Sequence, residues 1–140
     1  MKKVLIVILL LAFVSCARVP NPGSVPPGVQ VANLSRALAE TLRTSNQSIQ
    51  VLRDQARITP AETRIIQNYL VIAAGAGKQM DAELMSADPW AVQSQKIIQI
   101  WTATSIGVAR DHLGADAKEI LNTIIVVVNQ VMAIIGGPSI

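Results

Sequence analysis

Apolar residues recur every three or four positions along most of this 140-residue chain, from about Val29 to Ile135. That spacing places them on one stripe of a helix, so the chain should fold as packed helices rather than as a sheet. The pattern is interrupted only briefly, at residues 58–59, 86–88 and 112–115. Because such short connections join neighbouring helices that run in opposite directions, we expect an all-α, up-down-up-down four-helix bundle. The predicted helices span about residues 29–57, 60–85, 89–112 and 116–135.

The start of the second predicted helix has the strongest local signal in the chain. Thr59 suits the N-cap, Pro60 suits the first helical position, and Glu62 completes a Thr-x-x-Glu capping box. Similar signals predict the other helix ends. Asp88-Pro89 should start the third helix, and Gly114 should end it by adopting a left-handed backbone conformation. Asp116-x-x-Glu119 is an acidic capping box for the fourth helix, and Gly136-Gly137-Pro138 should end that helix.

Two segments inside predicted helices are weak helix formers. Residues 44–48, Thr-Ser-Asn-Gln-Ser, have low helix propensity and could bend or break the first helix. The segment Ala73–Gly77 contains two glycines, and a glycine inside a helix costs about 1 kcal/mol relative to alanine. Close approach of a neighbouring helix would offset that cost. We therefore prefer a close-packed helix at Ala73–Gly77, with a break as the alternative.

The last predicted helix is the most apolar part of the chain after the N-terminal segment. Its polar residues fall on one narrow strip, formed by Glu119, Asn122, Asn129 and Gln130. Five consecutive β-branched residues, Ile124–Val128, would also suit a strand. No other segment reads as a strand that could pair with them, and a lone strand is unstable, so a helix is favoured. We expect this helix to lie deepest in the bundle or to supply an oligomer face.

The first sixteen residues have the pattern of an export signal. Lys2 and Lys3 precede an uncharged apolar run, Val4–Val14. That run is too short to cross a bilayer comfortably, because about 20 apolar residues are needed, but it suits the central part of a signal peptide. An uncleaved N-terminal anchor is one alternative, and a plain secretory signal cut near residues 15–17 is another.

The end of this segment, Phe13-Val14-Ser15-Cys16, resembles the lipobox of bacterial lipoproteins. The resemblance covers sixteen residues and implies cleavage between Ser15 and Cys16, with a covalent lipid such as palmitate on Cys16. The cysteine count agrees with it, because a single cysteine cannot form an internal disulfide and a free thiol is a liability outside the cytoplasm. The lipid on Cys16 would remove that liability.

The chain after the lipobox divides into a tether and a domain. Residues 17–28 contain four of the seven prolines and two glycines, and proline fixes φ and has no N–H to donate. We expect residues 1–15 to be a lipoprotein signal peptide, residues 16–28 a lipid-anchored, Pro/Gly-rich tether, and residues 29–140 the helical bundle. The protein would then be lipid-anchored in the cell envelope of a bacterium, encoded by host or phage, and face the periplasm or the cell exterior.

Composition and charge limit the kinds of partner. Apolar residues make up 51% of the chain and aromatic residues only 3%, so the core must be aliphatic. The twelve Lys and Arg residues fall to ten once Lys2 and Lys3 leave with the signal, against nine Asp and Glu. A nucleic-acid-binding domain is recognised by a basic surface. The processed chain is nearly neutral, so we expect no nucleic acid partner.

The sequence offers little that is typical of an enzyme or a metal site. It has one histidine, His112, and one cysteine, whereas metal sites are built from clusters of such residues. Gly75-Ala76-Gly77-Lys78 hints at a phosphate-binding loop but lacks its first glycine, its Ser or Thr and a preceding strand. We expect His112 to be a surface or capping residue, with a hydrolase that uses it as a third alternative. The prediction is a non-enzymatic protein without metal, and without a cofactor besides the lipid.

Two surfaces are candidates for contact with a protein partner or a second copy. Trp90 and Trp101 are eleven residues apart, which is three helical turns, so they share a face with Ile97 between them. Tryptophan is enriched where partners or membranes dock, although core packing is the alternative for both. The second surface is the arginine-rich face of the first predicted helix, formed by Arg36, Arg43, Arg53 and Arg57.

These observations predict a small membrane-anchored lipoprotein whose helical bundle acts as an envelope interaction or scaffold module. The rival prediction is a small integral membrane protein in which residues 4–14 stay as an anchor and the last helix inserts, giving a lytic or pore-forming product. That helix is short for a span, and its Asn122, Asn129 and Gln130 are costly in lipid.

Overall fold

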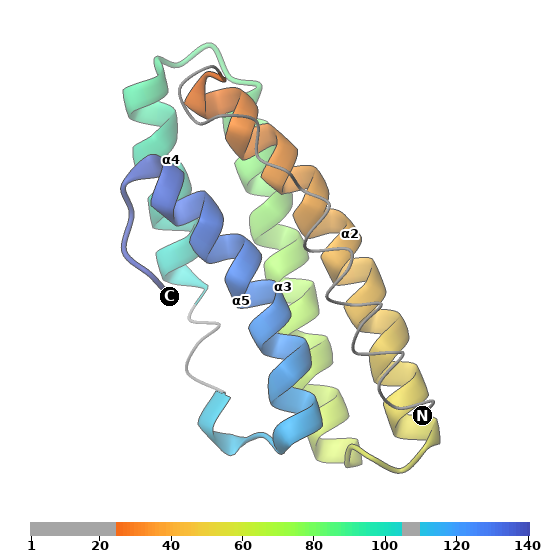
Figure 1. Ribbon diagram of the computed structural model, residues 1–140. Coiled ribbons are helices and arrows are strands. Elements are labelled where there is room, and N and C mark those ends of the chain that lie inside the picture. Colours follow the sequence, from red (N-terminus) through yellow and green to blue (C-terminus); the bar gives the residue numbers. More distant parts are fainter. Residues whose placement is uncertain (1–24, 105–109) are drawn as a thin grey trace.

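The computed structural model describes residues 25–104 and 110–140, which form four helices and no strand (Figure 1). The helices are α2 (Pro27–Asp54), α3 (Pro60–Leu84), α4 (Trp90–Ala103) and α5 (Ala115–Ile135). They pack together around one apolar core, which confirms the all-α class.

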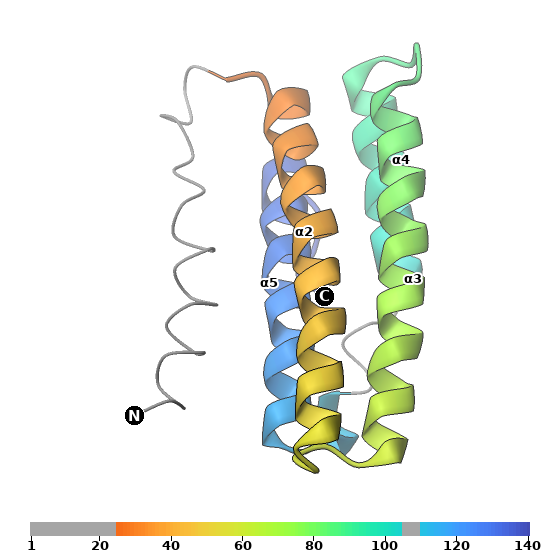
Figure 2. The ribbon, with the colours of Figure 1, turned by 90° about the vertical axis from the view of Figure 1, so that its right-hand side faces the viewer.

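Helix α2 packs most extensively against α5 and α3, and α4 packs against α3 and α5 (Figure 2). The core is aliphatic, as the low aromatic content predicts, and Trp101 is the one aromatic side chain of residues 25–104 and 110–140 that is fully buried in it. The largest contribution comes from α5, whose buried side chains are Ala117, Ile120, Leu121, Ile124, Ile125, Val127, Val128, Val131 and Met132.

The exposed side of α5 is a narrow strip. It contains Glu119, Asn122 and Gln130, together with the half-exposed Val126. Asn129 lies beside the strip, and its Oδ1 accepts a hydrogen bond of 2.9 Å from the backbone N–H of Ile140. The polar strip predicted for this helix is confirmed, and the strand alternative for residues 124–128 does not occur.

Helix α2 continues through residues 44–48 without a break. Its hydroxyl side chains bond back to the helix, because Thr41 Oγ1 donates to the carbonyl oxygen of Ala37 at 2.9 Å and Thr44 Oγ1 donates to that of Glu40 at 3.0 Å. Ser45 is buried on the inward face. Packing of this face outweighs the low helix propensity of the segment.

Helix α3 is also continuous through its two glycines. Gly77 is buried against α2, and a Cβ there would lie 3.5 Å from Leu38 Cδ2, an ordinary van der Waals contact. A Cβ on Gly75 would meet no atom within 4 Å. The close-packed interpretation therefore fits Gly77, while Gly75 lies on the open side of the helix.

The capping box at the start of α3 is confirmed. The backbone N–H of Glu62 donates to Thr59 Oγ1 at 3.1 Å, and the backbone N–H of Thr59 donates to Glu62 Oε2 at 2.8 Å. Both bonds satisfy backbone donors that have no partner within the helix.

The ends of α4 differ from the prediction. The helix begins at Trp90 with Pro89 as its N-cap, and the Asp88 carboxylate binds the Lys96 side chain instead of capping. It ends at Ala103, well before residue 112, and residues 110–112 form a separate 3₁₀ turn. A pattern of apolar residues does not distinguish a continuing helix from a short turn that points the same residues inward.

The predicted roles of Gly114 and Asp116 are also wrong. Gly114 has an extended conformation, with φ −68° and ψ 171°, and is the N-cap of α5 rather than a left-handed helix end. Asp116 makes no capping bond and instead binds Arg57. At the other end of α5, Gly136 adopts φ 73° and stops the helix as predicted, with the N–H of Gly137 bonded to the Met132 carbonyl oxygen.

The end of α2 contains a left-handed alanine. Ala56 has φ 54°, a conformation that costs an L-residue about 1–2 kcal/mol. The backbone N–H of Arg57 bonds to the Leu52 carbonyl oxygen at 2.9 Å, and that of Ala56 bonds to the Arg53 carbonyl oxygen at 2.9 Å. These two bonds are those of a Schellman motif, in which glycine is the usual residue at this position.

We predict that Ala56→Gly raises the free energy of unfolding by about 0.5–1 kcal/mol, because glycine adopts positive φ without steric cost. Denaturant unfolding followed by circular dichroism measures the effect. Ala39→Gly, at an exposed position in the middle of α2, is the matched control and should lower the same quantity by about 1 kcal/mol. An equal decrease in the free energy of unfolding in both variants would contradict the left-handed backbone conformation of residue 56.

Candidate functional site

The residues of the expected lipidation site, Ser15 and Cys16, lie outside the described residues, as does most of the tether. The described chain starts at Val25, and Pro27 and Gly28 already belong to α2. Proline suits the first turn because its φ is preset and its missing N–H would have no helical partner. The helical domain therefore begins two residues before the predicted boundary and eleven residues after Cys16.

Trp101 belongs to the core. Its side chain is fully buried, and its indole N–H donates to the sulfur of Met80 on α3 at 3.4 Å. Sulfur is a weak acceptor, but the bond provides the buried indole N–H with a partner. Ile97, one turn earlier, is buried on the same face of α4. Trp101 thus joins α4 to α3 and is not accessible to a docking partner in this structure.

Trp90 is only partly buried and lies at the start of α4. A Cβ on Gly28 of α2 would lie 3.5 Å from its Cζ3 atom, so the ring covers the first turn of α2. The two tryptophans point toward the same side of α4, as predicted. They do not form one exposed surface, because only Trp90 reaches the solvent.

The four arginines of the second candidate surface are all exposed, but they do not share one face. Arg36 and Arg43 are seven residues apart and lie on the outer side of α2. Arg53 is about a quarter turn away from them and pairs with the neighbouring Asp54 at 3.1 Å. Arg57 follows the end of the helix.

Arg57 connects the end of α2 to the start of α5. Its Nη2 donates to Asp116 Oδ1 at 2.5 Å and its Nε donates to Asp116 Oδ2 at 3.1 Å. Helical spacing predicts a pair with Asp54 instead, and that pair is absent because α2 ends at Asp54. Arg57 thus acts as a link between helices rather than as part of a free basic surface.

Glu62 makes a second link at the same end of the molecule. Besides its capping bonds to Thr59, its Oε1 accepts a hydrogen bond of 2.7 Å from the backbone N–H of Gly114, the N-cap of α5. The backbone N–H of Thr59, then that of Gly114, and then the Thr59 hydroxyl stabilise the carboxylate and lower the pKa of Glu62 below its ordinary 4.5. The capping box is predictable from sequence, whereas the bond to Gly114, 52 residues away, is not.

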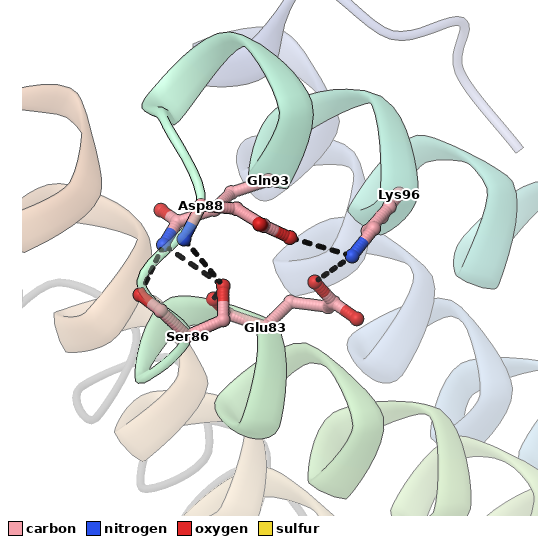
Figure 3. Close-up of polar contacts among 5 residues, drawn as sticks. All are labelled: Glu83, Ser86, Asp88, Gln93 and Lys96. Carbon is pink, nitrogen blue, oxygen red and sulfur yellow. Dashed lines mark hydrogen bonds and ion pairs between the residues drawn. The ribbon is translucent and has the colours of Figure 1, made fainter.

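The corner between α3 and α4 holds a polar cluster of five residues, Glu83, Ser86, Asp88, Gln93 and Lys96 (Figure 3). Lys96 Nζ lies 2.7 Å from Asp88 Oδ2 and 3.1 Å from Glu83 Oε2. Gln93 Nε2 donates to the backbone oxygen of Ser86 at 3.0 Å and to its hydroxyl at 3.3 Å. Sequence reasoning did not single out Lys96 or Gln93, because their partners lie across a turn rather than at helical spacing.

The charges of this corner neutralise one another in part. The hydrogen bond to Asp88 and, second, the contact with Glu83 raise the pKa of Lys96 above its ordinary 10.5. Glu83 Oε2 is shielded from solvent and lies at ion-pair distance from the ammonium, but outside hydrogen-bonding geometry. Glu83, Asp88 and Lys96 therefore stabilise the turn between α3 and α4, which is a structural role.

His112 is exposed in the 3₁₀ turn before α5. It is not part of a capping bond between described residues, and no group of three or more His, Cys, Asp or Glu residues in the described ranges could hold a metal ion. The absence of metal and of catalysis stays a prediction.

We predict that Trp101→Ala lowers the free energy of unfolding by about 3–5 kcal/mol, the range for removing a buried aromatic side chain. Trp90→Ala should cost clearly less, because its ring is only partly buried. Denaturant unfolding of both variants provides the comparison. A Trp101 variant as stable as the parent would show that this side chain is not part of the core.

We also predict that Glu62→Gln is destabilising above pH 4.5 and progressively less so in acid. The folded pKa of Glu62 is lowered, so its stabilising effect is fully present above the unfolded pKa and is lost as the pH falls through the folded pKa. At pH 7 we expect a loss of about 0.5–1 kcal/mol, because the site is open to solvent and the glutamine amide can still accept a hydrogen bond. Unfolding free energies measured from pH 7 to pH 3 check this.

The matched control is Glu40→Gln, which removes a carboxylate from the exposed side of α2. Its side chain makes no hydrogen bond or ion pair with another described residue, so the stability of this variant should stay within about 0.5 kcal/mol of the parent. A Glu62→Gln penalty that is the same at pH 3 and pH 7 would contradict the role of the ionised carboxylate.

The site residues thus fall into two groups that hold helix ends, one around Glu62 and Arg57 and one around Lys96, with Trp101 in the core and Trp90 at the surface. No protein-family model, curated protein or solved structure matches this chain.

Proposed function

We propose that this protein is a small lipoprotein of the bacterial cell envelope, anchored through lipid on Cys16, whose helical domain acts as an interaction or scaffold module rather than as an enzyme. The domain faces the periplasm or the cell exterior and binds a protein partner or a second copy. The observation that carries the proposal is the start of the packed helical domain at Pro27, directly after the proline-rich segment that follows the lipobox.

We further propose that the four helices form an up-down-up-down bundle. The connections 55–59 and 85–89 are too short to cross the length of a helix, which supports reversal of direction at each. The bonds from Arg57 to Asp116 and from Glu62 to Gly114 support the placement of the start of α5 beside the turn between α2 and α3.

The use of the charged side chains supports a scaffold role. Glu62, Asp88, Lys96 and Asp116 are each bound to a group at a helix end or turn. Charges used in this way fix the geometry of the helices relative to one another. A rigid domain of this kind can present exposed residues, such as Arg36 and Arg43, to a partner in a constant arrangement.

The rival function is that of a membrane-inserted lytic or pore-forming protein, and one observation favours it. Helix α5 is, among the described residues, the one helix that is long and apolar enough to cross a membrane. Against this stands the burial of its apolar residues against the other helices, which leaves the strip around Asn122 and Gln130 exposed. The core helix of a soluble domain has these properties.

The intact mass of the full chain, purified from a bacterial membrane fraction, tests the proposal. We expect a mass equal to residues 16–140 plus acyl chains, and we expect Cys16→Ser to abolish both cleavage and acylation. Carbonate extraction of the same fraction should leave the parent in the membrane. An unmodified chain of 14.9 kDa that stays membrane-bound would overturn the lipoprotein proposal and favour the inserted protein.

A further inference from the structure

The two ends of the helical domain differ in charge. We define the near end as residues 25–33 and 84–93, where the start of α2 meets the turn between α3 and α4 (Figure 1). Asp88 is the one charged residue in these ranges, and together with the adjoining Glu83 it is paired with Lys96. We define the far end as residues 51–64 and 110–119, which contain Arg53, Asp54, Arg57, Glu62, Arg64, Arg110, Asp111, Asp116, Lys118 and Glu119.

The near end also exposes large apolar side chains. Met85, at the end of α3, is 82% exposed, and Val29 and Val92 are 49% and 40% exposed. Partly buried Trp90 lies at the start of α4, in the same ranges, and packs over Gly28. Single exposed apolar residues are common on soluble proteins. Here three of them and a tryptophan gather at an end that is otherwise nearly uncharged.

The chain length before α2 determines which end can reach a membrane. Ten residues lie between Cys16 and Pro27, and even a fully extended chain, at about 3.6 Å for each of the eleven steps, spans at most about 40 Å. The 28 residues of α2 make it about 42 Å long. With a lipid on Cys16, the domain therefore cannot stand on the membrane by its far end, because its near end would then be out of reach of the anchor.

We propose that the near end rests on the lipid surface, with Met85, Val29 and Val92 in contact with the apolar edge of the headgroup region and Trp90 at the interface. This inference rests on the proposed lipid anchor. An amphipathic tryptophan suits the membrane–water boundary. Because the near end has no free cationic side chain, the contact is made by apolar area rather than by attraction to anionic lipid, and it occurs on neutral phosphatidylcholine.

Site-specific labelling of the full acylated chain in phosphatidylcholine vesicles tests this contact. The parent has no cysteine besides the acylated Cys16, so Met85→Cys and Val51→Cys each provide one thiol for the same fluorescent label. Val51 is the matched control, since it is 48% exposed and lies at the far end. Each label is quenched either by iodide in water or by brominated lipid.

We expect iodide quenching at residue 85 to be several-fold weaker than at residue 51, and brominated-lipid quenching to occur only at residue 85. Adding Val29→Asp and Val92→Asp, both at exposed positions, should restore iodide access at residue 85 while the protein stays on the vesicles. Equal access at residues 85 and 51 in an acylated, vesicle-bound protein would overturn the contact but leave the anchor intact. A mass without acyl chains would overturn both the anchor and the contact.

Discussion

Burial of the aliphatic surface of α5 is the constraint on which the rest of the structure depends. This helix is apolar around most of its circumference, and α2, α3 and α4 cover all of it except one polar strip. At about 25 cal/mol per Å² of buried apolar surface, such a helix contributes more to stability than any polar contact in the molecule. The long contact with α2 explains why that helix stays continuous through Thr44–Ser48 despite low propensity. Packing thus determines helix length as well as helix position.

Polar contacts have a different role, which is to determine how the helices end and turn. Glu62 holds two helix starts at once through Thr59 and Gly114, and Arg57 ties the end of α2 to Asp116 beside them. At the opposite end of α3, Lys96 binds two carboxylates that flank the turn into α4. None of these contacts is deep in the core, so each contributes modestly to stability. Together they select one arrangement of the helices among those that the aliphatic core would tolerate.

The difference between local and long-range signals explains what the sequence could predict. The helical spacing, the Thr59–Glu62 capping box and the glycine stop at Gly136 are properties of a few adjacent residues, and all three are confirmed. The end of α4 at Ala103, the role of Gly114 and the pairing of Arg57 with Asp116 depend on residues brought together by packing, and prediction failed there. Trp101 illustrates the same limit for the candidate site, because residue type and spacing suit both a docking face and a core, and only its contact with Met80 distinguishes them.

The placement of the methionines determines which of them an oxidant can reach and convert from a thioether to a polar sulfoxide. Met80 and Met132 are buried by the helices, and a sulfoxide on Met80 would add an oxygen to the packed core beside the Trp101 indole. Among the three methionines that the structure describes, Met85 is the one exposed to solvent. Oxidative damage would therefore reach Met85 first, at a position where an added oxygen leaves the core packing untouched. Oxidation at this surface position thus leaves intact the apolar core that holds the four helices together.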